Sequence, residues 1–171
     1  MESPELTGAP NPAIVTGEVA AFRAALPDGG MLLGIDTGTK TLGVAMCDAS
    51  WRFASPGKPI VKRKFTQDKA ALAALIAERG VKGIVVGLPL NMDSSDGPRA
   101  QSARAFARNL AALGLPILLW DERWSTVSAE RALIEQDMSR ARRAERIDSA
   151  AAATILQAAI DALTGGMTRE A

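Results

Sequence analysis

Three aspartates stand where an α/β chain places its chemistry. Asp36 and Asp121 each end an apolar run, and Asp148 lies in the first turn of a predicted helix. Ligands of open α/β sheets bind at the carboxyl ends of the strands, so the first two acids would share one edge. Carboxylates that meet in one cleft repel one another unless a proton or cation intervenes. Oxygen ligands favour Mg²⁺ or Mn²⁺, which activate water and stabilise the leaving oxygen in phosphodiester cleavage. The pattern predicts metal-dependent hydrolysis of a phosphate ester.

Each acid also has an ordinary structural use. Asp36 can begin a turn, Asp121 can cap a helix, and Asp148 can favour its own helix dipole. Glu122 is a second candidate at the end of the last strand, because neighbouring strand residues face opposite sides of the sheet.

Basic side chains lie close to these acids in the sequence. Lys40, in the turn after Asp36, could neutralise a phosphate oxygen. A cluster of four arginines precedes Asp148: Arg140, Arg142, Arg143 and Arg146. Such a run is usually a solvated face, but its position beside an acid favours a role in holding phosphates. The basic stretch 62–64 could extend this surface or simply end a strand.

Composition narrows the chemistry. The chain has no His, which excludes Ser-His-Asp triads, His-ligated zinc and imidazole acid–base catalysis.

Its single cysteine, Cys47, lies in an apolar run, and we expect a buried thiol in a reducing, cytoplasmic setting. With 20 basic and 19 acidic residues the net charge is +1, so contact with nucleic acid requires a local patch. No long apolar stretch opens the chain, and we expect neither a signal peptide nor a membrane span.

The hydrophobic pattern predicts the elements that would position these residues. Two apolar runs, 31–36 and 42–47, predict a β-hairpin, and a strand limited by prolines follows over 52–60. Further strands are predicted over 81–88 and 116–120, and helices over 66–79, 99–113, 125–136 and 147–163. This order predicts an α/β fold with a mixed five-stranded central sheet, three antiparallel strands then alternating α and β, and helices on both faces.

The length of 171 residues predicts one domain. We expect that domain over residues 31–165, after a flexible N-terminal extension over 1–30 and before a C-terminal tail over 166–171. The extension is rich in Pro, Gly and small residues, and within it residues 19–26 could form about two helical turns.

Four sequence blocks in this order resemble the YqgF (RuvX) family. They are GIDTGTKTLGVAMCD, VVGLPLNMD, DERWSTVSAERAL and RIDSAAAATILQ, and the resemblance covers residues 32–163. It implies an RNase H-like fold related to the RuvC resolvases. It also implies a metal-dependent nuclease that matures the 5′ end of precursor 16S ribosomal RNA in ribosome biogenesis.

The resemblance assigns roles to particular residues. The acidic centre of the family falls on Asp36, Asp121 and Asp148, Lys40 matches its basic position, and Arg123 matches the Arg of the DER triplet. Trp124 stands where an aliphatic residue is commoner, and Arg146 stands where Lys is frequent. These departures leave the choice of substrate open.

Three alternatives remain beside an RNA-processing nuclease. A Holliday junction resolvase would act on four-way DNA junctions, and its paired cuts would favour a symmetric dimer. The first block is shared with actin-like ATPases, but those proteins enclose nucleotide between two such domains, and 171 residues supply one. A non-catalytic RNA-binding assembly factor could keep the same fold. We expect a nucleic-acid partner, precursor ribosomal RNA or branched DNA, no organic cofactor, and a monomer or homodimer away from membranes.

Overall fold

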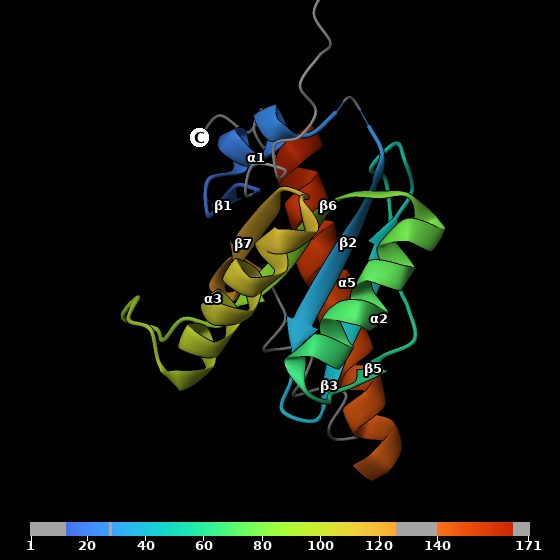
Figure 1. The fold of residues 1–171 in the computed structure, drawn as a ribbon. Helices are drawn as coiled ribbons and strands as arrows, with labels where there is room; N and C mark the ends of the chain where they lie inside the picture. The colour runs from blue at the N-terminus through green and yellow to red at the C-terminus, as the bar shows by residue number, and fades with distance from the viewer. Residues whose placement is uncertain (1–12, 28, 126–139, 166–171) are drawn as a thin grey trace, which may run out of the picture.

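A seven-stranded mixed sheet forms the centre of the molecule (Figure 1). The computed structural model describes residues 13–27, 29–125 and 140–165, and within the last helix it describes side chains from residue 150 onward. The strands are β1 (Val15–Thr16), β2 (Met31–Thr37), β3 (Thr41–Cys47), β4 (Ala54–Pro56), β5 (Ile60–Val61), β6 (Val81–Leu88) and β7 (Ile117–Asp121). They follow the order β1-β7-β6-β2-β3-β4, and β5 also pairs with β3.

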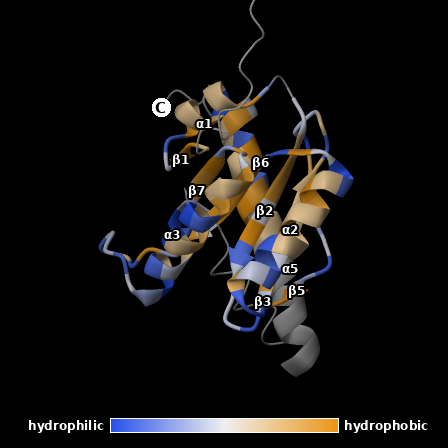
Figure 2. Cartoon of the chain, in the orientation of Figure 1, coloured by the Kyte–Doolittle hydropathy of each residue, from blue (hydrophilic) through white to orange (hydrophobic). Residues whose placement is uncertain are grey.

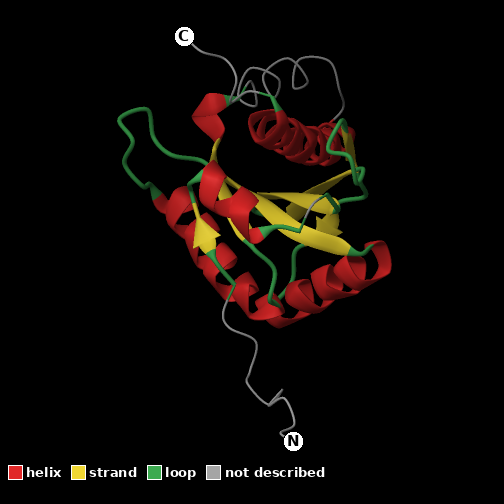
Figure 3. Cartoon of the chain, turned by 90° about the horizontal axis from the view of Figure 1, so that it is seen from above, coloured by secondary structure: helices red, strands yellow, loops and turns green. Residues whose placement is uncertain are grey.

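Helices cover both faces of this sheet, as Figure 3 shows from above. The helices are α1 (Val19–Ala25), α2 (Phe65–Arg79), α3 (Pro98–Leu110) and α5 (Arg140–Thr164), with 3-10 turns η1 (Ala111–Leu113) and η2 (Glu122–Trp124). Helix α5 packs on one face, against β2, β3 and β6, while α2 and α3 pack on the other. No helix in the described part of the chain is long and apolar enough to cross a membrane.

The sheet divides the apolar interior into two layers (Figure 2). Leu32 and Val85 pack with Leu156 in the layer under α5. Leu33 packs with Leu72 of α2 in the opposite layer. Parallel strands β2, β6 and β7 are therefore buried on both faces, which is why their sequences are nearly continuous apolar runs.

These observations confirm the predicted α/β class with its mixed sheet and helices on both faces. Helix α2 ends at Gly80 (φ 66°) and η1 ends at Gly114 (φ 86°), each directly after the last residue of a predicted helix, 66–79 and 99–113. Both adopt the left-handed conformation that glycine tolerates best.

Three elements differ from the prediction. The strand expected over 52–60 is two short strands: β4 ends at Pro56, which still pairs with Ala45, and β5 begins after Pro59, which has no N–H to donate to β3. The last helix begins at Arg140 and not at 147, so the arginine cluster lies on that helix. The helix predicted over 125–136 lies, apart from Ser125, outside the described residues.

Part of the predicted N-terminal extension is built into the fold. Strand β1 pairs in parallel with β7, and Ile117 donates its backbone N–H to the carbonyl of Ile14. In α1 the side chain of Phe22 is fully buried, beside Leu26 and the backbone of Gly83. Residues 13–27 therefore extend the sheet and close the core, which short-range composition does not reveal.

Candidate active site

Three parallel strands, β2, β6 and β7, bring their carboxyl ends to one edge of the sheet. Ile35 pairs with Val86, and Leu88 pairs with Asp121. Asp36 follows Ile35 and is only 1% exposed. Both predicted strand-end acids thus lie at the edge where α/β sheets place their sites.

The side chain of Asp36 faces α5. Side chains alternate along a strand, and Gly34, two residues before Asp36, lies against that helix. A Cβ atom on Gly34 would lie 2.8 Å from Cβ of Leu156 and 3.1 Å from the carbonyl oxygen of Ala152. Asp36 therefore lies on the α5 face of the sheet, shielded from bulk water.

Glu122 lies on the same face. It begins η2 directly after β7, and it is 8% exposed. A Cβ atom on Gly87 of β6 would lie 3.0 Å from Oε2 of Glu122 and 2.6 Å from Cδ1 of Ile155 in α5. Strand β6 lies between β2, which carries Asp36, and β7, which precedes Glu122. Because residue 87 of β6 is a glycine, it places no side chain between the two acids.

Asp121 occupies the opposite face. Trp120 before it packs under α5, so the alternation turns Asp121 towards the side of α3. Its Oδ1 accepts bonds from the backbone N–H of Arg123 (2.9 Å) and from Nε (3.0 Å), and its Oδ2 accepts from Nη2 (2.6 Å). The guanidinium of Arg123 holds the pKa of the Asp121 carboxyl below its usual value, although burial opposes the shift. The same contact raises the pKa of Arg123, so both groups stay charged at neutral pH.

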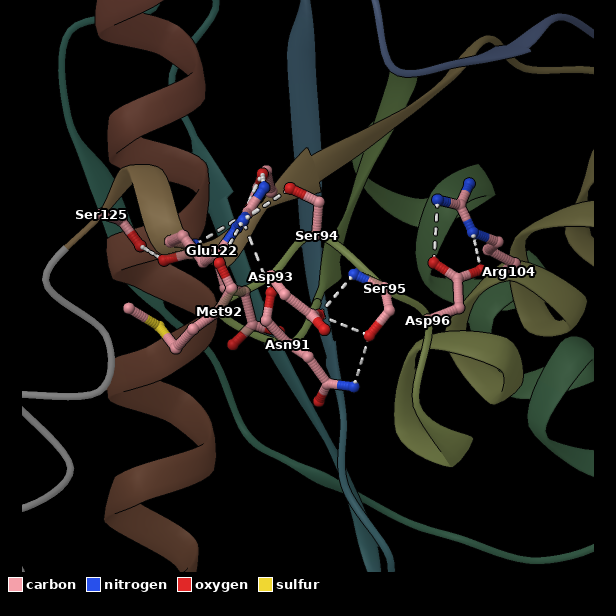
Figure 4. Close-up of polar contacts among 11 residues, drawn as sticks. Asn91, Met92, Asp93, Ser94, Ser95, Asp96, Arg104, Glu122 and Ser125 are labelled. Carbon is pink, nitrogen blue, oxygen red and sulfur yellow. Dashed lines mark hydrogen bonds and ion pairs between the residues drawn. The ribbon is translucent and has the colours of Figure 1, made fainter.

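Arg123 also holds the loop that follows β6, whose residues 91–96 are labelled in Figure 4. Its Nη1 donates to the carbonyls of Asn91 (3.4 Å) and Met92 (3.3 Å) and to Oγ of Ser94 (3.1 Å). Ser94 adopts φ 75°, a left-handed conformation that few residues other than glycine take. Sequence reasoning did not single out Ser94, because neither its strained backbone nor its contact with Arg123 leaves a sequence signal. The ion pair thus places this loop beside the acidic edge.

The backbone of α5 brings residue 148 to the same edge. The helix runs antiparallel to β2 and β6. Near its end, the carbonyl of Leu163 accepts a hydrogen bond from Nη1 of Arg23 in α1, whereas Ala152 lies over the middle of β2. Asp148 precedes Ala152 by one helical turn, which places its backbone towards the strand ends. Its side chain lies outside the described residues.

For the basic residues predicted to bind phosphate, the structure gives the position of Lys40 and only the backbone of the arginine cluster. Lys40 is exposed in the β2–β3 turn, where its carbonyl accepts the backbone N–H of Lys62. The arginine cluster lies in the first two turns of α5, before Asp148, and its side chains are not among those described: Arg140, Arg142, Arg143 and Arg146.

The acidic edge fits a divalent cation in its donor chemistry. Asp36 and Glu122 offer only carboxylate oxygens, the ligands that Mg²⁺ and Mn²⁺ prefer. The absence of a side chain at Gly87 lets Glu122 and Ile155 approach the β6 backbone more closely than a Cβ atom would allow. Among the described side chains no group of three or more His, Cys, Asp or Glu could hold a metal ion.

Known proteins of one family are similar to this chain over most of its length. The family described as "RuvX: Holliday junction resolvase" matches residues 30–162. A protein of Novosphingobium aromaticivorans named "Putative pre-16S rRNA nuclease" is 66% identical over 152 residues, covering 89% of this chain and 98% of its own. A protein of the same name from Sphingopyxis alaskensis is 67% identical over 151 residues, covering 88% of this chain and 99% of its own.

A solved structure shares the fold at low sequence identity. It is Thermus thermophilus RuvC in complex with a Holliday junction substrate, with a TM-score of 0.51 and 15% identity over 80% of this chain and 97% of that chain. The likeness supports the RNase H-like fold that the sequence blocks implied. The chain therefore belongs to the RuvX family.

Proposed function

We propose that this protein is a metal-dependent nuclease that processes the 5′ end of precursor 16S ribosomal RNA in the cytoplasm. One observation carries the proposal: Asp36 and Glu122 are both buried on the α5 face at the carboxyl ends of β2 and β7, the two strands that flank β6 and its Gly87. Buried carboxylates that share one face of a sheet edge favour a bound proton or cation, and the match to a resolvase family favours the cation.

In this proposal Asp36 and Glu122 are metal ligands, and Asp148 completes the site from α5. A divalent cation bound there would lower the pKa of a water molecule and stabilise the leaving oxygen of a phosphodiester. Lys40 and the arginine cluster would hold flanking phosphates. Asp121, which sequence reasoning placed among the ligands, is a positioning residue in this proposal, because it holds Arg123 and through it the loop 91–94.

The choice of RNA over DNA rests on the names of the relatives. The family description keeps resolution of four-way DNA junctions as the second candidate. A resolvase would be a symmetric dimer that makes paired cuts, whereas an RNA-processing enzyme needs one cut and no such symmetry.

The test compares wild type with Asp36→Asn and Glu122→Gln. Glu78→Gln, an exposed acid on α2, is the matched control. The labelled substrates are precursor ribosomal RNA with its 5′ leader, single-stranded RNA, duplex and a four-way DNA junction, each with Mg²⁺, Mn²⁺ or chelator. We expect cleavage of the leader RNA by wild type and Glu78→Gln, and at least a hundredfold loss in both site variants and in chelator.

The remaining outcomes also discriminate. Cuts in the junction alone would transfer the assignment to a resolvase. Undiminished cleavage by a well-folded Asp36→Asn would contradict the acidic centre. An inactive wild type that still binds the leader RNA would favour the non-catalytic assembly factor.

A further inference from the structure

A hollow of about 160 Å³ opens on the face of the sheet opposite Asp36. Its walls come from the β2–β3 turn, from Lys62 after β5 and from the start of α3. Thr37, which lines it, is the next residue after Asp36, and alternation turns the two side chains to opposite faces. The hollow and the proposed acidic site thus lie on opposite faces of the sheet at the same edge.

The interior of the hollow is suited to a flat ring. Phe106 lines it, is 8% exposed, and is held by an edge-on contact with Phe65 at 5.8 Å between ring centroids. Pro98 and Thr39 line other parts of the wall. An apolar cavity of about 150 Å³ accommodates a benzene ring, so this volume has room for one aromatic ring. Nucleobases stack on such aromatic and apolar surfaces with little sequence preference.

Positive charge surrounds the opening. Lys62 and Arg99 both line the hollow and are both exposed. Among the described residues the salt bridges are Arg104–Asp96 and Arg123–Asp121, so neither cation is neutralised by a described carboxylate. Nζ of Lys62 donates to the carbonyl of Gly38 at 3.2 Å, which keeps it at the rim. The first turn of α3 adds the positive end of a 13-residue helix.

We infer that this hollow binds one nucleotide of the substrate strand, with its base against Phe106 and its phosphate at Lys62 and Arg99. The inference rests on the proposed nuclease function. A nucleic-acid strand bound at the acidic site must pass over the sheet edge, at Asp36 and Thr37, to reach the hollow. A nucleotide held here would fix which phosphodiester lies at the acidic site. The hollow is therefore a specificity pocket for a flanking nucleotide.

The first test measures binding and not cleavage. The full chain is titrated in chelator against short, fluorescently labelled single-stranded RNA, so the readout does not depend on metal or turnover. We expect Arg99→Ala to weaken binding at least fivefold, since it removes a phosphate contact. Arg108→Ala, the same change at an exposed position further along α3, should stay within twofold of wild type.

A second test separates a base from a bare phosphate. Ser102 lines the hollow from the exposed side of α3, so Ser102→Trp fills the hollow without changing charge. We expect it to weaken binding at least fivefold, whereas Asn109→Trp, exposed on the same helix, does not. An abasic residue moved along the RNA should weaken binding by wild type at one position, and Ser102→Trp should lose that dependence. If Arg99→Ala weakens binding but Ser102→Trp and the abasic residues do not, the site takes a phosphate alone and the inference is wrong.

Failure of the two proposals can be told apart. If the hollow variants bind weakly as expected but wild type cleaves nothing, the nucleotide pocket stands and the nuclease function fails. If wild type cleaves the leader RNA and the hollow variants bind and cleave like wild type, the pocket inference is overturned while the nuclease stands. A wild-type chain that binds none of the oligonucleotides also overturns the pocket.

Discussion

Oε2 of Glu122 lies 3.0 Å from the point where a Cβ atom on Gly87 would stand. The same point is 2.6 Å from Cδ1 of Ile155, so the glycine is enclosed by the proposed metal ligand on one side and by α5 on the other. Any side chain here would displace one of them. This relationship makes position 87 a sensitive test of the proposed site.

Gly87→Ala is expected to reduce cleavage at least tenfold, because the methyl group would push Glu122 or α5 away from Asp36. Crowding a packed core by one methyl group costs about 1 to 3 kcal/mol in the free energy of unfolding. Cleavage rates and urea unfolding of the same preparation measure both effects.

Gly34→Ala is the matched control for that substitution. Its Cβ atom would lie 2.8 Å from Cβ of Leu156, so the same crowding arises against α5 but away from Glu122. We expect a comparable loss of stability and a much smaller loss of cleavage at a temperature where the variant is folded. Equal losses of cleavage in both variants would remove the special role of position 87.

Asp121→Asn tests the ion pair with Arg123. The pKa of Asp121 is lowered in the folded protein, chiefly by its bonds from Arg123, so ionisation of this group stabilises the fold above the unfolded pKa of about 3.9. That contribution disappears as the pH falls through the lowered folded pKa. We expect the variant to be about 1 to 2 kcal/mol less stable than wild type at pH 7, because a charged hydrogen bond is lost. The difference should shrink below about pH 4, as urea unfolding at several pH values will show.

The same variant separates positioning from catalysis. Since Asp121 acts through Arg123 and the loop 91–94, Asp121→Asn should raise KM for RNA more than it lowers kcat. Glu122→Gln should chiefly lower kcat. If Asp121→Asn instead abolishes kcat with an unchanged KM, Asp121 belongs to the acidic centre, as the family resemblance implied.

Cys47 is expected to react slowly with iodoacetamide while the protein is folded. The thiol is 3% exposed, and burial raises its pKa above the ordinary value, so little thiolate forms at neutral pH. Unfolding exposes the thiol and returns the pKa to normal, which should raise the rate at least a hundredfold. Mass spectrometry of samples labelled with and without urea measures this rate; rapid labelling of the folded chain would contradict a buried role.

Phe22→Ala tests whether α1 belongs to the folded unit. Phe22 is fully buried, and truncation of such a side chain costs about 3 to 5 kcal/mol. Phe53→Ala is the control, because Phe53 is 73% exposed and its truncation should change stability by less than about 0.5 kcal/mol. Urea unfolding compares the two variants. Equal stability of both would mean that residues 13–27 do not contribute to the core.

Local features of the chain predicted much of the fold. The helix ends at Gly80 and Gly114 follow from a backbone conformation that glycine tolerates, and the buried strands follow from continuous apolar runs. The acids at the strand ends could also be predicted from the sequence, because the end of an apolar run marks the end of a strand. Strand β1 could not be predicted, because two residues have no periodicity and gain their stability only by pairing with β7.

The sequence by itself determined the α/β class, the order of β2, β3, α2, β6, α3 and β7, and the presence of Asp36, Asp121 and Glu122 at the ends of two strands. Only the tertiary structure decided which member of the Asp121–Glu122 pair lies with Asp36 under α5. The two neighbours point to opposite faces, and packing of α5 against Gly34 and Gly87 determines which face carries the proposed acidic site. That choice depends on contacts between residues far apart in the chain, which no local pattern carries.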